Sequence, residues 1–296
     1  MPARAEVVVL PLRRSPVRAA LAALRPRQWS KNLLLFAGLV FAAKLGDAIR
    51  WLEAAAAFVA YCAASSGAYL VNDVRDVEHD RGHPLKRLRP VARGELSARR
   101  ALMLSVALSI VAFALVAPLG IASVAFLAGF LALQGAYSLG LKHVVLLDVF
   151  AIAALFVLRS AAGAAAVDVR ISPWLLLVTA LLALFLALAK RRSELVLPGS
   201  SRPVLDGYSL PFVDQLIAVT VACTIAAYAI YTFTAHSPAL MATIPFVVFG
   251  LFRYLLLVHR DDLGEEPENV LLTDRPLVAA VVLWAVTAAV ILALTT

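Results

Sequence analysis

The sequence predicts an all-α fold, a polytopic membrane bundle of nine transmembrane helices. Of its 296 residues, 62% are hydrophobic and only 16% are charged, whereas a soluble domain is typically about 45–50% apolar and about 25% charged. A soluble chain of this length would lack the polar side chains that its surface requires, and a lipid bilayer removes that requirement. Segments of alternating polarity, which mark an outer-membrane barrel, are missing from the sequence.

Cysteine content and charge exclude further classes of protein. Cys62 and Cys223 are the only cysteines, and both lie inside apolar runs, so neither a disulfide framework nor a cysteine metal cluster is expected. The formal net charge is +8, but no basic segment interleaved with aromatic residues lies outside the apolar runs. We therefore expect membrane lipids, and no nucleic acid, as partners of the basic residues.

Nine apolar runs are long enough to cross the membrane, because a spanning helix needs roughly 20 mainly apolar residues. The first run is short and ends near Lys44, and the third and fourth are joined only by residues 117–120. The predicted spans are 29–45, 51–71, 100–117, 120–139, 144–166, 173–189, 212–234, 238–258 and 276–294.

Lys and Arg residues orient the chain, because cytoplasmic connections are enriched in positive charge. Lys and Arg crowd the segment before the first span and the second–third and sixth–seventh connections, whereas the alternate connections hold only Lys44, Arg50 and Arg170. We expect a multi-pass protein of the plasma membrane, with its N-terminus in the cytoplasm and its C-terminus outside.

Residues 1–24 are expected to form a basic arm, and residues 25–296 a single nine-helix domain with cytoplasmic connections 72–99, 190–211 and 259–275. Polar residues concentrate in the first two of these connections, so the active site is expected at the cytoplasmic face of the bundle.

The most informative polar segment, residues 72–80, directly follows the second span. If the helix continues at 100° per residue, one quadrant of it holds an acidic stripe made of Asn72, Asp73, Asp76 and Asp80. The three carboxylates of this stripe repel one another unless a cation lies among them. Oxygen ligands of this kind suit Mg²⁺, which also bridges to substrate phosphates. The segment therefore predicts a Mg²⁺ cofactor, and the alternative is a solvated acidic helix end.

A basic segment follows over residues 82–94. Gly82 and the prolines after it break the helix, so Lys86, Arg87 and Arg89 are expected to fold back beside the acidic stripe. Carboxylates with a metal ion beside guanidinium groups form a site for a doubly charged diphosphate. The alternative is anchoring at the membrane surface, which would need no acidic neighbour.

These residues resemble the UbiA superfamily of intramembrane prenyltransferases. The resemblance rests on the acidic stripe and on the element Arg89-Pro90-x-x-x-Gly94 after it, and the nine transmembrane helices of that superfamily agree with the count of spans. Further strings resemble the decaprenyl-phosphate phosphoribosyltransferase branch of actinobacteria. They are residues 25–32, 137–142 and 189–194, together with His83-Pro84-x-Lys86-Arg87. The resemblance covers roughly residues 25–275.

The sequence departs from the superfamily between the sixth and seventh spans, where the prenyltransferases carry a second aspartate motif. This chain instead has a mostly cationic group, Lys190, Arg191, Arg192 and Glu194. A cationic group suits a substrate that carries more phosphate. Phosphoribosyl pyrophosphate, with a diphosphate at one end and a 5-phosphate at the other, fits this pattern better than a prenyl diphosphate.

The resemblance implies Mg²⁺-dependent transfer of 5-phosphoribose from phosphoribosyl pyrophosphate to a polyprenyl phosphate such as decaprenyl phosphate, with release of pyrophosphate. The product would supply cell-wall arabinan. The acceptor is already an anion, so positioning and leaving-group neutralisation would dominate catalysis. The implied catalytic residues are Asp73, Asp76 and Asp80, which with Asn72 would also bind the metal. The candidate substrate-binding residues are Lys31, Asn32, Asn72, Lys86, Arg87, Arg89, Tyr137, Lys142, Lys190, Arg191 and Glu194.

Two other functions remain open. An aromatic prenyltransferase of the same superfamily would transfer a prenyl chain to a quinone precursor, and the missing second aspartate motif counts against it. A lipid or small-molecule transporter would also be a polar-poor helical bundle, but it would usually show broken helices in corresponding halves and charges near the membrane midplane. The sequence leaves the oligomeric state open, with a homo-oligomer among the possibilities.

Two charged residues inside the fifth predicted span need partners elsewhere. Asp148 and Arg159 share nearly the same side of the helix but lie three turns apart, so they cannot pair with each other. We expect each to pair with a residue of a neighbouring helix or to face the interior of the bundle.

Overall fold

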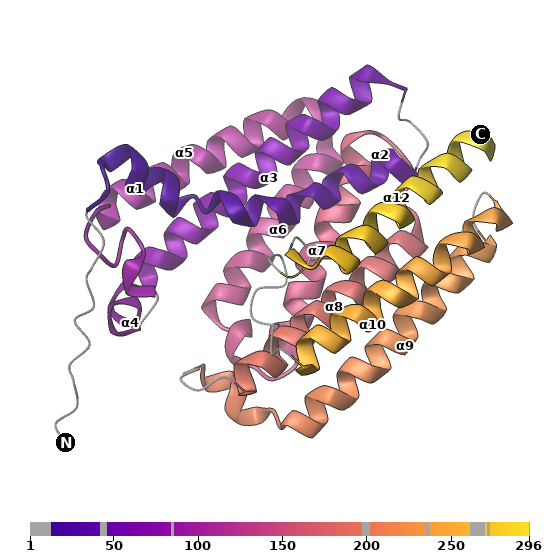
Figure 1. Ribbon diagram of the computed structural model, residues 1–296. Helices are drawn as coiled ribbons and strands as arrows, with labels where there is room; N and C mark the ends of the chain where they lie inside the picture. The colour runs from indigo at the N-terminus through magenta and orange to yellow at the C-terminus, as the bar shows by residue number, and fades with distance from the viewer. Residues whose placement is uncertain are drawn as a thin grey trace. The chain divides into compact units, whose positions relative to one another are not determined.

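The computed structural model describes residues 13–41, 46–83, 86–196, 202–234, 237–260, 270 and 273–295, and it contains helices and no strand within these ranges. Eight of its helices are long and apolar enough to cross a membrane, so the chain is a multi-pass membrane protein (Figure 1). The eight are Ala48–Arg75, Ala98–Leu119, Ile121–Leu139, Leu147–Ala166, Pro173–Val196, Leu210–Thr234, Pro238–Arg260 and Arg275–Leu294.

These helices confirm eight of the nine predicted spans. Six of them are α3 (Ala48–Arg75), α6 (Ile121–Leu139), α7 (Leu147–Ala166), α8 (Pro173–Val196), α9 (Leu210–Thr234) and α12 (Arg275–Thr295). The other two join an α-helix to a short 3₁₀ helix. They are α5 (Ala98–Val116) with η3 (Ala117–Leu119), and η6 (Pro238–Thr243) with α10 (Ile244–Arg260).

The first predicted span, residues 29–45, is not among the eight. Its described part lies on a 3₁₀ helix, η1 (Pro26–Phe36), that leads into the short α2 (Ala37–Phe41), and residues 42–45 lie outside the described residues. The ninth span and the orientation of the termini therefore stay predictions. The expected N-terminal arm is helical over α1 (Pro16–Ala23), where Ala19 and Ala23 are buried, and residues 1–12 are not described.

The chain divides into two compact units. Unit 1 consists of Met1–Trp29 and Ala63–Val111, and unit 2 consists of Ser30–Cys62 and Ala112–Thr296. The boundaries fall inside α3 and α5, so each of these helices contributes residues to both units.

Unit 1 joins α1, the second half of α3, α4 (Val77–Gly82), η2 (Lys86–Leu88) and the start of α5. Small side chains allow α3 and α5 to approach closely, and the Ser105 hydroxyl donates a hydrogen bond to the carbonyl oxygen of Gly67 at 2.9 Å. The buried core of the unit consists of Ala23, Leu70, Val91, Leu96 and Ala101.

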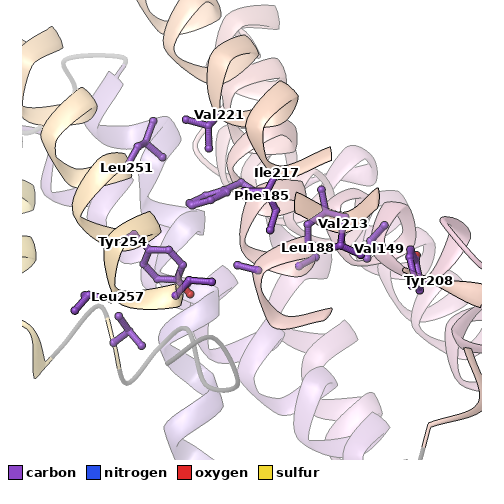
Figure 2. Packing of buried hydrophobic residues seen from close by; sticks show 14 of the residues in the cluster. Val149, Phe185, Leu188, Tyr208, Val213, Ile217, Val221, Leu251, Tyr254 and Leu257 are labelled. Atoms are coloured by element: carbon purple, nitrogen blue, oxygen red, sulfur yellow. The ribbon is translucent and has the colours of Figure 1, made fainter. Parts of the chain in front are cut away.

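Unit 2 has a larger core, built from α7, α8, α9, α10 and α12. Figure 2 shows Phe185 of α8 beside residues of α9 and α10. Its ring packs edge-on against Tyr254 with centroids 5.3 Å apart. Arg253 of α10 forms a two-point ion pair with Asp274 (3.1 and 2.8 Å), and Asp274 also caps the first turn of α12 by accepting from the Leu277 N–H.

A close backbone contact holds η1 and α2 against α7 within unit 2. A Cβ atom added at Gly163 would overlap the carbonyl oxygen of Leu35 and lie 2.7 Å from its carbonyl carbon. A Cβ atom at Gly38 would lie 2.7 Å from the Cα of Ala164. Glycine at these positions lets two backbones touch, as small residues do between membrane helices.

Gly163→Ala is expected to destabilise the fold because the added methyl group meets backbone atoms that cannot move aside. Overpacking of this kind costs about 1–3 kcal/mol. Gly129→Ala in α6 is the matched control, because nothing lies within 4 Å of its added Cβ and alanine favours a helix. Melting temperatures in detergent test the pair, and equal values for the two variants would contradict the contact.

Candidate functional site

The acidic stripe spans the end of α3, a turn and α4. Asp76 lies in the turn, with φ −92° and ψ 11°. Its N–H donates to the carbonyl of Asn72 (2.9 Å), and the N–H of Asp80 donates to the carbonyl of Asp76 (2.8 Å). The helical hydrogen-bond spacing therefore continues through the turn. Asp73 and Asp80 are each 1% exposed and contact the same arginine.

Two arginines neutralise these carboxylates. Arg89 Nη1 lies 2.7 Å from Asp80 Oδ2 and 3.3 Å from Asp73 Oδ1. Arg25 Nη2 also donates to Asp73 Oδ1, and its guanidinium lies 4.8 Å from the centre of the Tyr69 ring. We refer to Arg25, Asp73, Asp80 and Arg89 as the Asp–Arg cluster.

Local contacts place both arginines. Arg25 adopts a left-handed backbone conformation (φ 54°) between α1 and η1. Ser66 of α3 fixes the residues beside it, because its hydroxyl accepts from Trp29 Nε1 (3.0 Å) and donates to the Leu24 carbonyl (2.8 Å). Arg89 follows η2 and precedes a turn in which the Pro90 carbonyl accepts two backbone N–H groups.

One carboxylate oxygen of the cluster lacks a hydrogen bond. Asp73 Oδ2 is buried and has no partner among the residues that the structure describes. A buried unpaired carboxylate oxygen is costly, and a divalent cation would satisfy it. No group of three or more His, Cys, Asp or Glu side chains in the described ranges could hold a metal ion. The residues fit Mg²⁺, which commonly takes one or two carboxylates and completes its shell with water and substrate phosphate.

The other predicted residues of unit 1 lie close in sequence to members of the Asp–Arg cluster. Asn72 and Asp76 are half-buried, as are Lys86 and Arg87 on η2. The backbone N–H of Lys86 donates to His83 Nδ1 at 3.3 Å. Partial burial, assisted by the nearby charge of Lys86, lowers the pKa of His83, so its ring is neutral at pH 7 and can accept that bond.

The cationic group predicted on α8 is largely paired with carboxylates. Arg191 is 1% exposed; its Nε donates to Asp148 Oδ2 at 2.6 Å and its Nη1 pairs with Glu194. Arg192 Nε donates to Asp214 Oδ1 at 2.7 Å. The argument from an excess of positive charge to phosphoribosyl pyrophosphate is therefore not supported by the structure, since each arginine has an acidic partner.

Three further residues that were predicted to bind substrate lie in unit 2. They are near the cationic group of α8 or on the connections beside that helix. Tyr137 of α6 is half-buried and within electrostatic range of the Arg191 guanidinium. Lys142, in η4 (Leu141–His143), and Lys190 of α8 are also half-buried.

Asn32, a predicted phosphate ligand, lies in the interior of unit 2. Its side-chain oxygen accepts from Arg159 Nε at 2.8 Å, and its amide nitrogen donates to Cys62 Sγ at 3.3 Å. The Arg159 guanidinium also packs on the rings of Phe130 (4.7 Å) and Phe156 (5.2 Å). The neighbouring Lys31 is half-buried on η1.

The prediction that Asp148 and Arg159 have separate partners on other elements is confirmed. Asp148 binds Arg191 of α8, and Arg159 binds Asn32 of η1. Sequence reasoning missed Arg25 as a partner of Asp73, and it missed Tyr208, whose hydroxyl donates to Asp148 Oδ1 at 2.6 Å. Arg25 belongs to a string that supports the family resemblance, whereas Tyr208 has no distinguishing sequence context.

The fold defines a class of protein, a polytopic helical membrane protein. The profile of the UbiA prenyltransferase family matches residues 33–272, and the chain belongs to this family. It is therefore a membrane-embedded transferase.

Several relatives of the chain share one name. The decaprenyl-phosphate phosphoribosyltransferase of Mycolicibacterium smegmatis is 34% identical over 293 residues, covering 90% of each chain. The protein of the same name from Corynebacterium glutamicum is 34% identical over 279 residues, covering 88% of this chain and 83% of that protein. The structure of a UbiA homolog from Archaeoglobus fulgidus bound to GPP and Mg²⁺ aligns with a TM-score of 0.71 at 18% identity, over 93% and 99% of the two chains. At that identity, the likeness establishes the fold alone.

Arg89→Gln is expected to destabilise unit 1, because it leaves two buried carboxylates with one guanidinium fewer. Loss of one partner of a largely buried ion pair lowers the free energy of unfolding. Because Arg89 is partly exposed, we expect a loss of about 2–3 kcal/mol. Arg81→Gln is the matched control. Arg81 and its partner Glu78 have side chains that are 53% and 80% exposed, and such pairs contribute about 0.5 kcal/mol or less. Thermal melting of the purified proteins measures both, and an unchanged Arg89→Gln variant would contradict the role of the cluster.

Proposed function

We propose that this chain transfers the 5-phosphoribosyl group of phosphoribosyl pyrophosphate to a polyprenyl phosphate, such as decaprenyl phosphate, and releases pyrophosphate. The supporting observation is the shared name of relatives that are 34% identical over most of both chains. The Asp–Arg cluster supplies the chemistry that this reaction needs, because its two carboxylates and two arginines suit a metal-bound diphosphate.

Asp73 and Asp80 would hold Mg²⁺, with Asn72 and Asp76 beside them on the acidic stripe. When bound, Mg²⁺ would neutralise charge on the departing diphosphate. Arg25 and Arg89 lie at the same carboxylates and would bind diphosphate oxygens by charge-assisted hydrogen bonds. Lys86 and Arg87 are the further candidates for this role in unit 1.

In this reaction, the bond between the anomeric carbon of the ribose and the diphosphate breaks, and a bond from that carbon to the lipid phosphate forms. The acceptor oxygen already carries negative charge, so it needs no general base. The enzyme contributes orientation and neutralisation of the leaving group. The apolar helices would keep the polyprenyl tail in the bilayer while its phosphate reaches the membrane surface.

The setting of the reaction is also a proposal. The distribution of Lys and Arg favours the plasma membrane, with the site at the cytoplasmic face and the C-terminus outside. The product would supply lipid-linked pentose for cell-wall arabinan.

Transfer of a prenyl group is the second candidate function. Two observations favour it: the carboxylate partners of Arg191 and Arg192 remove the excess of positive charge, and the similar structure from Archaeoglobus fulgidus contains GPP and Mg²⁺. The higher identity of the phosphoribosyltransferases to this chain ranks this function second.

Purified protein in detergent is expected to release pyrophosphate from phosphoribosyl pyrophosphate only when polyprenyl phosphate and Mg²⁺ are both present. A chelator should stop the reaction, and the lipid product should carry phosphoribose. Turnover of geranyl diphosphate with an aromatic acceptor, and none of phosphoribosyl pyrophosphate, would show that the second function is the correct one.

Asp73→Asn and Asp80→Asn are each expected to lower kcat/KM about 100-fold or more, because each removes a charge from the proposed metal site. Asp206→Asn is the matched control, since Asp206 lies exposed in η5 (Pro203–Gly207). Melting temperatures confirm that the variants are folded. Full activity in both cluster variants would exclude these carboxylates from catalysis.

A further inference from the structure

A further carboxylate of unit 1, that of Glu95, lies buried a few residues after the Asp–Arg cluster. The side chain of Glu95 is 1% exposed. Its Oε1 accepts from the backbone N–H of Arg14 at 3.2 Å, and its Oε2 accepts from Arg14 Nη1 at 3.1 Å. Arg93 Nη1 lies 3.2 Å from the same Oε1. Both oxygens of Glu95 are therefore bound by a residue of the N-terminal arm.

Arg14 also binds the main chain directly before Arg89. Its Nη1 donates to the carbonyl oxygen of Leu88 at 3.2 Å. One guanidinium therefore joins Leu88 to Glu95, and these are the two ends of segment 88–95, which carries Arg89. We call Arg14, Leu88 and Glu95 the Arg14 clasp.

The peptide unit between Leu88 and Arg89 has both of its polar groups bound. Its carbonyl oxygen accepts from Arg14, and its N–H, which belongs to Arg89, donates to the Lys86 carbonyl at 2.9 Å. A trans peptide unit is planar, and its carbonyl and N–H point in opposite directions, so bonds at both groups fix its orientation. Because the Arg89 side chain leaves the main chain at the next Cα atom, the clasp limits where its guanidinium can reach.

A turn shapes the second half of segment 88–95. The carbonyl oxygen of Pro90 accepts from the N–H groups of Glu95 (2.9 Å) and Leu96 (3.2 Å), and Gly94 adopts a left-handed backbone conformation (φ 70°). The clasp connects this turn to Leu88, which lies on the other side of Arg89 in the chain. The main chain is therefore held both before and after Arg89.

Packing places Arg14 for this contact. Arg14 lies two residues before α1, and Ala23 at the end of α1 belongs to the same buried core as Val91 and Leu96. Val91 lies within segment 88–95 and Leu96 directly follows it. The arm and the segment therefore share one core, and the clasp fixes them to each other by hydrogen bonds.

Stability alone does not require a carboxylate at position 95. Burial of the Glu95 carboxylate has a desolvation cost that its partners need not repay in full, and an apolar side chain of similar volume would often pack as well. An apolar side chain would not hold Arg14 on the Leu88 carbonyl. The clasp therefore gives the main chain a direction that packing alone does not give.

We propose that Arg14 and Glu95 are positioning residues for Arg89. They hold the main chain before Arg89 so that its guanidinium meets the diphosphate of the substrate. This inference rests on the proposed function, in which the Asp–Arg cluster binds the diphosphate of phosphoribosyl pyrophosphate. All residues of the clasp and of the cluster belong to unit 1. The N-terminal arm then contributes to substrate binding, in addition to any attachment to lipids.

Arg14→Gln tests the clasp. We expect it to raise the KM for phosphoribosyl pyrophosphate about fivefold, less than the loss of a charge-assisted hydrogen bond would cause, because Arg89 is loosened and not removed. Arg13→Gln is the matched control. It makes the same change of charge at the neighbouring residue, whose side chain is exposed, and it should leave the KM unchanged. Arg14→Lys keeps the charge and should raise the KM less than Arg14→Gln.

Two further variants separate positioning from a loss of stability. The Ser105 hydroxyl, also in unit 1, donates a buried hydrogen bond to the Gly67 carbonyl, so Ser105→Ala should lower the melting temperature and leave the KM unchanged. Glu95→Gln weakens the clasp from its other side and should also raise the KM. It provides a second variant if Arg14→Gln does not fold.

A double variant tests whether Arg14 acts through Arg89. Arg89→Lys keeps the charge but replaces a rigid planar fork by a flexible point charge, which depends less on how its main chain is held. Arg14→Gln should therefore raise the KM less in the Arg89→Lys protein than in the wild type, since the two changes affect one interaction.

A binding measurement separates this inference from the proposed function. The rise in melting temperature on addition of inorganic pyrophosphate with Mg²⁺ should be smaller in Arg14→Gln than in the wild type and Arg13→Gln. No phosphoribosyl transfer, with that difference retained, would overturn the function and keep the inference. A wild-type KM and pyrophosphate response in both Arg14→Gln and Glu95→Gln, an equal rise in KM with and without Arg89→Lys, or no wild-type response to pyrophosphate would overturn the inference.

Discussion

The pairing of buried charges inside an apolar bundle is the constraint on which this structure depends. An ionised group removed from water is costly unless an opposite charge or several hydrogen bonds compensate it. Arg89 meets this requirement for Asp73 and Asp80, and Asp148 meets it for Arg191. In unit 1, Arg89 reaches the acidic stripe from the irregular segment after η2. In unit 2, Asp148 and Arg191 pair directly between α7 and α8.

Hydropathy predicted eight of the helices because a long apolar run in a bilayer has few alternatives to a helix. It did not predict η1. That segment is held by the close approach of the Leu35 backbone to Gly163, more than a hundred residues away along the chain. A contact between two backbones leaves no periodic pattern in a single sequence. The same limit applies to Arg25, whose left-handed backbone conformation and contact with Asp73 depend on Ser66 and the residues around it.

The sequence predicted which charged residues belong to the site better than it predicted which of them form ion pairs. Helical spacing indicated that Asp73 and Asp80 share a side, and the same geometry showed that Asp148 and Arg159 cannot pair with each other. It did not identify their partners, because those lie on other elements, and the charge of α8 was therefore misjudged. Lys190, Arg191 and Arg192 read as an excess of positive charge only while Asp148 and Asp214, which belong to other helices, are left out.

Neutralised arginines suit an enzyme that must remain folded between substrates. An unpaired guanidinium inside the bundle would destabilise the empty protein, and it would attract any anion that entered. Arg191 avoids both effects, because Asp148 and Glu194 compensate its charge. A sequence reports the net charge of a segment, but it does not report which of those charges are paired with residues of other helices.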